Sequence, residues 1–399
     1  MIHRKSLFCF ALLSFVGIQV LFAQNSEAIL TSYKRNFVKS NLASKSGILR
    51  DAATDEKASE FMGSLYEFAL NFVLQYTDIL QDDPDMVNLA VSASRGLGEV
   101  SYTDGTEVLW KLFISCKETV TRVEALKGLA LLGKGNTLVV NNLNQYLLDQ
   151  NDLFLSGMTP DYPILSACIS ALGNLADSES FSVLFSSMIV GYSDTISRDA
   201  AKALSLLQGD YRSFLLTVIK NNPPAEKLAA FNAGMGTSKF VPDDLGELAE
   251  ASLSITLEPL FSNDEVKGIL DELRYASIRQ LTALKWKHAL DLAIKNFYRV
   301  QEDYSAGTAE KGQLIDAIKC LGVMESPTAA QNLALYLGLL NSQMERTGQF
   351  DEEITLAIIQ VLGDMGDKIS FDYLLYMSYL AYPETIQSAA RGALDKLQW

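Results

Sequence analysis

The sequence predicts an all-α protein whose helices come in repeated pairs, and three observations lead to this prediction. A short apolar phrase returns along most of the chain, for example as AVSASRGLGEV (90–100), LSACISALGNLAD (165–177) and LAIIQVLGDMGD (356–367). Within each copy the apolar residues stand at i, i+3, i+4 and i+7, which is the spacing of one helix face. No segment shows the sustained apolar–polar alternation between hairpin turns that indicates strands.

The first element of the chain, residues 1–23, is typical of a secretory signal peptide. It has a basic start and then the apolar run LFCFALLSFVGIQVLFA, which ends at Ala23. Such a segment is removed on export. After it, no stretch offers the roughly 18 uninterrupted apolar residues of a membrane-spanning helix. We therefore expect an exported chain without a transmembrane segment, located in a periplasm or in the extracellular space.

The next element, residues 24–85, is expected to be an N-terminal helical cap. Its pattern predicts two helices, at about 25–40 and 55–80, separated by the polar stretch SNLASKSG (40–47). A cap is expected because an array of repeats must cover its terminal apolar face.

Residues 86–399 contain the repeats, which share one register. We take as reference positions the central residues Leu97, Leu129, Leu172, Leu204, Gly234, Leu281, Leu321, Leu362 and Leu394. Each phrase is followed by a polar turn and a second amphipathic helix, as at 105–113 and 211–219. A unit this short buries little apolar surface alone, so the copies must stack into a continuous core. Irregularity is expected around 221–275, where the prolines of NNPP (221–224) break the pattern.

The ALG-x-L-x-D phrase, preceded by arginine in RVEAL and RDAAKAL, resembles the HEAT repeat and its phycobilisome-lyase-type HEAT-like relative. The resemblance covers about residues 86–399. It implies a right-handed α-solenoid, a superhelix of HEAT-like helix pairs. It says less about activity, because the family includes scaffolds, transport receptors, lyases and some nucleic-acid enzymes.

Composition argues against several classes of function. The chain has 33 basic and 48 acidic residues, and cleavage would remove Arg4 and Lys5, leaving a net charge of −17. Such a chain repels nucleic acid. After cleavage it would hold one histidine, His288, and three cysteines, so neither a multi-histidine metal site nor a disulfide framework is expected. No pattern indicates a catalytic pair, a cofactor or a metal. Cys168 and Cys320 are expected to be buried, and Cys116 is the thiol to test for reactivity.

One column of the repeats is a candidate for partner binding. Two positions before the reference residues stand Arg95, Lys127, Ser170, Lys202, Asn232, Arg279, Lys319, Gln360 and Gly392. The basic members Arg95, Lys127, Lys202, Arg279 and Lys319 are expected to point away from the buried face, since each helical residue turns by about 100°. In HEAT-type stacking this column would line the concave side and receive an acidic or extended segment of a partner protein. The alternative is that these cations pair with acids of adjacent repeats or keep the helices soluble.

These observations favour a non-enzymatic function: an exported scaffold or adaptor of the cell envelope that binds partner proteins. One alternative is a HEAT-like lyase or chaperone-type enzyme acting on an exported protein. Another is a nucleic-acid enzyme, which the negative charge disfavours.

Overall fold

A computed structural model of the chain describes residues 27–80, 82–258 and 263–398. Helices dominate these residues, and no β-strand is found among them apart from an isolated bridge between Asp367 and Gln398. The all-α prediction is confirmed for this part of the chain. The predicted signal peptide, residues 1–23, lies outside the described residues.

The chain divides into two compact units, one ending at Gly209 and the other beginning at Asp210. In the first unit, residues 27–39 are helical. They are followed by α2 (Leu42–Thr54), α3 (Met62–Leu80), α4 (Pro84–Glu99), α5 (Thr106–Ser115), α6 (Thr119–Leu132), α7 (Thr137–Leu155), α8 (Tyr162–Leu175), α9 (Phe181–Ile189) and α10 (Asp194–Leu206). Short 3₁₀ turns at Glu56–Phe61, Thr103–Gly105 and Ser178–Ser180 lead into α3, α5 and α9.

The second unit is also built from paired helices. They are α11 (Tyr211–Asn221), α12 (Pro224–Gly236), α13 (Pro242–Thr256), α14 (Asp264–Leu284), α15 (Leu290–Ser305), α16 (Lys311–Gly322), α17 (Pro327–Thr347), α18 (Glu352–Met365), α19 (Phe371–Tyr376) and α20 (Glu384–Leu394). Turns of 3₁₀ helix stand at Lys287–Ala289, Lys368–Ser370 and Met377–Tyr379.

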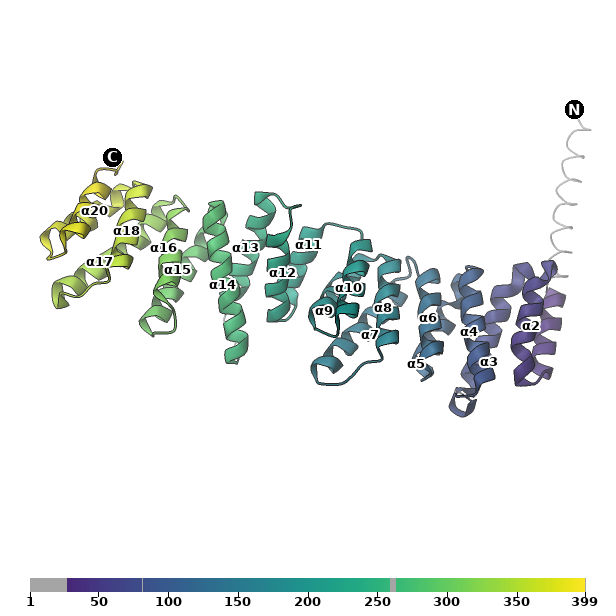
Figure 1. Cartoon of the computed structure of the whole chain (residues 1–399). Helices are drawn as coiled ribbons and strands as arrows, with labels where there is room; N and C mark the ends of the chain where they lie inside the picture. Colours follow the sequence, from purple (N-terminus) through teal and green to yellow (C-terminus); the bar gives the residue numbers. More distant parts are fainter. Residues whose placement is uncertain (1–26, 81, 259–262, 399) are drawn as a thin grey trace, which may run out of the picture. The chain divides into compact units, whose positions relative to one another are not determined.

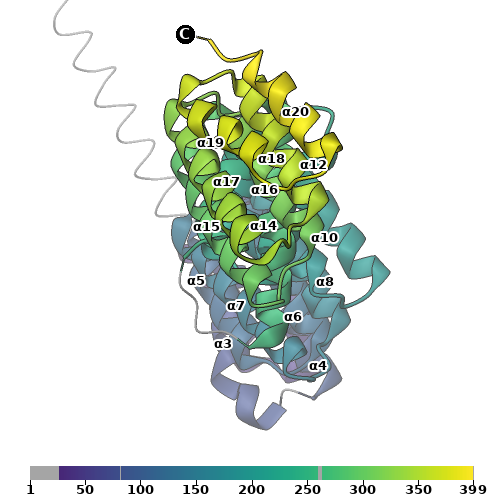
Figure 2. The ribbon, with the colours of Figure 1, turned by 90° about the vertical axis from the view of Figure 1, so that its left-hand side faces the viewer.

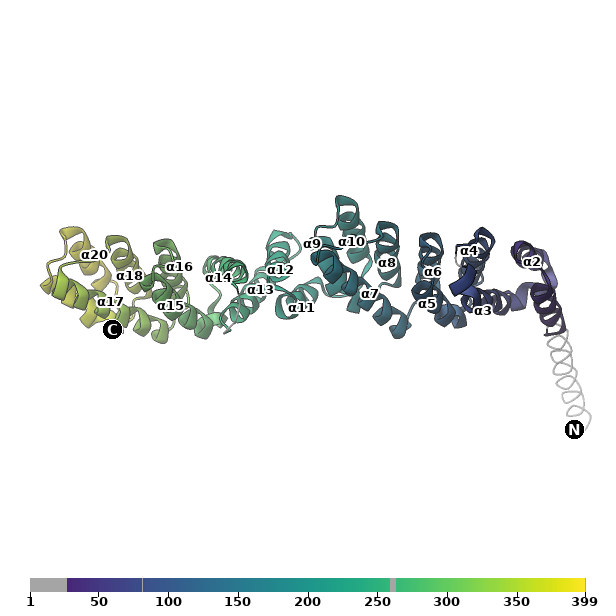
Figure 3. The same ribbon diagram turned by 90° about the horizontal axis from the view of Figure 1, so that it is seen from below.

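Within each unit the helices that carry the recurring phrase form one layer. In the first unit α4 packs on α6, α6 on α8 and α8 on α10; in the second, α12, α14, α16, α18 and α20 pack in that order. We call these the phrase helices. In the first unit, α2 packs on α4 at the start of this layer, whereas α5 and α7 lie along one side of α6 and α8, as Figure 3 shows. Figure 2 shows the same separation of α15, α17 and α19 from α16, α18 and α20.

The recurring small and apolar residues pack between the phrase helices. The reference leucines are buried, except that Leu204 and Leu394 on the last phrase helix of each unit are partly exposed. Small residues allow close contact: a Cβ built on Gly363 would lie 2.9 Å from the Cα of Ala393, so α18 and α20 touch backbone to backbone. Helix packing this close requires glycine on that face.

Two stretches differ from the sequence-based expectation. Of the polar residues 40–47, only 40 and 41 separate two helices, whereas 42–47 begin α2, which Asn41 caps by accepting a hydrogen bond from the Ser44 amide. This extra helix forms because α2 packs on α4, which covers its apolar face. Around 221–275, the expected irregularity is limited: α12, α13 and α14 are regular helices, and Pro224 occupies the first turn of α12. Residues 259–262 lie outside the described part.

Several helices that precede a phrase helix have the free carbonyls of their last turn hydrogen-bonded in one of two ways. Where the connection is short, a polar side chain two helical turns before the reference residue donates to the free carbonyls. Arg122 reaches the Phe113 carbonyl at 3.1 Å, and Lys227 reaches those of Ile219 and Lys220 at 2.7 and 2.8 Å. Ser197 and Gln387 do the same from α10 and α20. Burial lowers the pKa of Lys227, which is held at the carbonyl end of α11.

Where an apolar residue holds that position instead, the connection is longer and contains glycine. Leu165 and Leu314 follow connections in which Gly157 and Gly307 adopt φ of 90° and 75°. A left-handed glycine ends a helix by folding the chain back onto its last carbonyls. At these six helix ends, the four shorter connections use a side-chain donor and the two longer ones use glycine.

The two units also share a longer repeat that spans several helices. Residues 161–207 align without a gap with residues 351–397, and Leu172-Gly173, Ser180-Phe181 and Tyr192 match Leu362-Gly363, Ser370-Phe371 and Tyr382. The correspondence extends back to α6 and α16, where α16 has 12 residues and α6 has 14.

A buried polar network occurs in both copies of this longer repeat. In the first unit the Asn151 side chain accepts from the Tyr192 hydroxyl at 2.9 Å, and its amide lies 3.5 Å from the Val183 carbonyl. In the second, Asn341 accepts from Tyr382 at 3.2 Å and donates to the Tyr373 carbonyl at 3.0 Å. The same bonds between the same places show that the two segments repeat each other in structure as well as in sequence.

Candidate partner-binding surface

All five basic residues of the candidate column are exposed. They lie on the phrase helices, with Arg95 on α4, Lys127 on α6 and Lys202 on α10 in the first unit, and Arg279 on α14 and Lys319 on α16 in the second. Their neighbours one position on, such as Gly96 and Gly128, are buried. The helical periodicity thus places the column on the side of each phrase helix that faces away from its core.

Two of these five cations bind an acid of the same chain. Arg95 Nε and Lys127 Nζ each lie 3.1 Å from a carboxylate oxygen of Glu124, whose side chain is only 9% exposed. The Arg95–Glu124 pair joins α4 to α6, so at these positions the expected alternative, pairing between adjacent repeats, occurs. The two cations are 59% and 61% exposed, so each pair contributes less than about 1 kcal/mol.

The other three cations are in a different environment. Lys202, Arg279 and Lys319 form no ion pair with any residue in the described ranges. The five residues therefore differ in their pairing. Two are bound to Glu124, and three have no ion pair within the described ranges.

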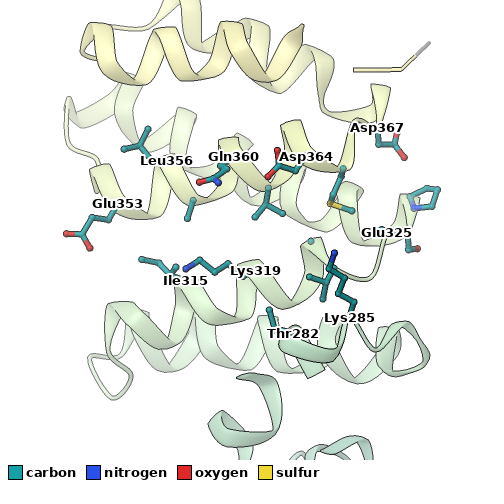
Figure 4. Close-up of a pocket in the computed structure, with 17 residues that line it drawn as sticks. Thr282, Lys285, Ile315, Lys319, Glu325, Glu353, Leu356, Gln360, Asp364 and Asp367 are labelled. Carbon is teal, nitrogen blue, oxygen red and sulfur yellow. The ribbon is translucent and has the colours of Figure 1, made fainter. Parts of the chain in front are cut away.

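Lys319 lies in the middle of a hollow in the second unit. The hollow has a volume of about 1010 Å³ and runs between α16 and α18, with the end of α14 at one side. Figure 4 shows Glu353 at one end and Glu325 and Lys285 at the other, with Gln360 and Asp364 facing Lys319 from α18. Its apolar lining comes from Ile315, Val323, Leu356, Ala357, Val361 and Met365.

Lys127 lines a second hollow, in the first unit. This one has a volume of about 460 Å³ and runs between α6 and α8. Its lining is mostly small and apolar, with Val123, Ala130, Leu131, Ala167 and Ala171, and it has a polar edge formed by Ser166, Ser170 and Asn174.

The sequence analysis identified the two lysines but not the hollows that contain them. The spacing of one column is visible in the sequence, whereas a hollow depends on how far apart two packed helices stand. The gapless alignment of 161–207 with 351–397 was a signal that could have singled out α6–α8 and α16–α18 as related pairs.

Within the described residues, the thiols and the histidine lie in different surroundings. All three cysteines in the described ranges are buried and reduced. Burial raises the pKa of Cys168 to about 12 and that of Cys320 to about 11, and it raises the pKa of Cys116 as well. A raised pKa keeps a thiol protonated and unreactive at neutral pH. Cys116, which the sequence marked for testing, is thus held as a neutral thiol, and His288 is exposed and stacks on Trp286.

Among the described helices, none has the length and apolar character needed to cross a membrane. No model of a known protein family matches the chain, and no curated protein matches it.

Proposed function

We propose that this protein is an exported, non-enzymatic scaffold or adaptor of the cell envelope, active in the periplasm or outside the cell. Its phrase helices and their partners would form a right-handed α-solenoid of HEAT-like pairs, and the exposed side of the phrase helices would bind partner proteins. The partner would present an acidic or extended segment to this surface.

The observation that carries the proposal is the position of Lys202, Arg279 and Lys319. These cations stand exposed and without an ion pair on phrase helices of a strongly acidic chain. The core of each unit is filled by apolar and small residues, and its cysteines are buried and protonated. The exposed side of the phrase helices therefore holds the chemistry that is open to a partner.

The test replaces Lys127, Lys202 and Lys319 together by glutamate. Each exposed ion pair contributes less than about 1 kcal/mol, so several must be removed at once to abolish binding. We expect the variant to lose capture of the native envelope partner in a pull-down and to keep its helical circular dichroism spectrum. Undiminished capture would reject this surface as the binding site.

A matched control changes the same number of charges elsewhere. Lys111, Lys220 and Lys295 are exposed on α5, α11 and α15, which are not phrase helices. Their replacement by glutamate makes the chain equally more acidic, so capture should persist if the column itself is responsible. Equal loss in both variants would attribute binding to net charge alone.

A further inference from the structure

The two hollows occupy equivalent places in the longer repeat. The α6–α8 pair corresponds to α16–α18, and the lining residues correspond one by one: Lys127 to Lys319, Ala167 to Ala357, Val123 to Ile315, Ala171 to Val361, Ser170 to Gln360 and Asn174 to Asp364. The lysine and the alanine are identical, and the other four of these pairs keep their apolar or polar character. Two more lining pairs change it, since Ser166 corresponds to Leu356 and Pro163 to Glu353.

The shared chemistry is an apolar floor with a lysine at the equivalent position, and the larger hollow has a second lysine, Lys285, at one end. In both hollows a partly buried alanine lies on the floor beside other apolar residues, among them Val123 in the smaller hollow and Ile315 in the larger one. An aliphatic or aromatic side chain fits such a floor because burial of apolar surface is favourable. The lysine would bind a carboxylate next to that side chain.

The acids that line the larger hollow form no ion pair with Lys319. Asp364 binds Lys396 at 2.8 Å, Glu353 lies 3.5 Å from Lys311, and Glu325 pairs with Lys287. Asp367 accepts the Ile369 amide at 3.0 Å. Each carboxylate thus has a partner in its own chain, while Lys319 pairs with no carboxylate in the described ranges. In the smaller hollow Lys127 does have a carboxylate partner, the largely buried Glu124, which it shares with Arg95.

We propose that this protein is bivalent: each hollow binds one copy of the same kind of partner segment, a polypeptide stretch with a carboxylate beside an aliphatic or aromatic side chain. This inference rests on the proposed function, and it adds the number of sites and the chemistry of the partner. A partner that carries two such segments can occupy both sites at once. It then binds more tightly than either site would bind a single segment.

The test selects random dodecapeptides, displayed as a library, on the full-length chain, and then titrates a selected peptide by calorimetry. We expect selected peptides to carry Asp or Glu close to an aliphatic or aromatic residue, and two peptides to bind each chain. Trp in place of Ala167 or Ala357 fills one hollow, so A167W and A357W should each bind one peptide and the double variant none. Ala225 is exposed on α12 outside both hollows, and A225W should still bind two.

The lysines are tested separately by replacement with methionine, which keeps the apolar stem. Each of K127M and K319M should weaken one of the two sites about fivefold, the effect of one exposed ion pair. One peptide per chain, selection of peptides without carboxylates, or unchanged binding by the double tryptophan variant would each overturn the inference. If the double tryptophan variant captures the native partner as strongly as the unmodified chain does, the hollows are rejected as binding sites and the proposed scaffold function stands. If the unmodified chain captures no partner at all, the proposed function itself fails.

Discussion

At the scale of single residues, the side-chain donors that close the helix ends hold successive helix pairs together. Arg122 is the clearest case, because it donates to the Phe113 carbonyl, lies 3.4 Å from the Tyr146 hydroxyl and stacks 4.6 Å from the centre of the Phe113 ring. It thereby joins α6 to both α5 and α7. An apolar side chain of similar length would leave the carbonyl end of α5 without this donor.

Replacement of Arg122 by methionine should lower the free energy of unfolding by about 2–3 kcal/mol. A charge-assisted hydrogen bond and a cation–π contact are both lost, and a buried carbonyl loses its donor. Urea denaturation followed by circular dichroism measures the change. Arg198 provides the control, since it is exposed and bonds only within its own helix, to Asp194 and Thr195. R198M should change stability by less than about 0.5 kcal/mol; equal effects would contradict the role given to Arg122.

Cys168 makes stability depend on alkaline pH. Burial raises its pKa from 9.0 to about 12, so the folded chain keeps a proton that the unfolded chain releases. The stabilisation is complete below pH 9 and is lost as the pH rises towards 12. Replacement by alanine, the residue found in sister copies, should make the decline between these pH values shallower by up to about 1.4 kcal/mol per pH unit. Denaturation curves at several pH values measure the slope, and an unchanged slope would show that Cys168 does not titrate as described.

At the scale of elements, close contact between phrase helices depends on glycine. A Cβ on Gly173 would lie 2.8 Å from Ala203 Cα, and one on Gly363 would lie 2.9 Å from Ala393 Cα. In each case the obstacle is backbone, which cannot turn aside as a flexible side chain can. A methyl group added at either glycine would therefore force the two helices of that pair, α8 and α10 or α18 and α20, to move apart.

G173A and G363A should each lower the melting temperature and cost about 1–3 kcal/mol, because the helices must separate to admit the methyl group. Gly268 provides the control: it is exposed on α14, and nothing lies within 4 Å of its added Cβ. There alanine favours the helix, and G268A should gain about 0.5–1 kcal/mol. Thermal denaturation compares the three variants, and stabilisation by G363A would mean that the helices are not in close contact.

At the scale of the whole molecule, most contacts join helices that are near one another in the chain. In a repeat protein, stability is approximately a sum of local terms, so damage remains local. In G363A we therefore expect faster amide hydrogen exchange in α16–α20 and unchanged exchange in α4–α8. Exchange followed by mass spectrometry resolves these segments. Uniformly faster exchange across both would show that the chain unfolds as one cooperative body.

Much of the fold was predictable because it depends on local patterns. Apolar spacing around Leu97, Leu172 and Leu362 placed the phrase helices, and the same period placed Lys319 on an exposed face. The polar residues 40–47 were predicted as a break, but only 40 and 41 interrupt the helices, because Asn41 capping and packing on α4 outweigh the weak helix preference of 42–47. Helix propensity is a small term, which tertiary burial overrides.

By itself, the sequence determined the all-α class, the phrase-helix register and the exposed column of cations, since each follows from the angle between successive helical residues. Only the tertiary structure decided which cations are paired, as with Glu124 between Arg95 and Lys127, and where neighbouring helices leave a hollow. Those outcomes depend on distances between helices. Such distances are set by the side chains that two helices bring together, and no single repeat contains both partners.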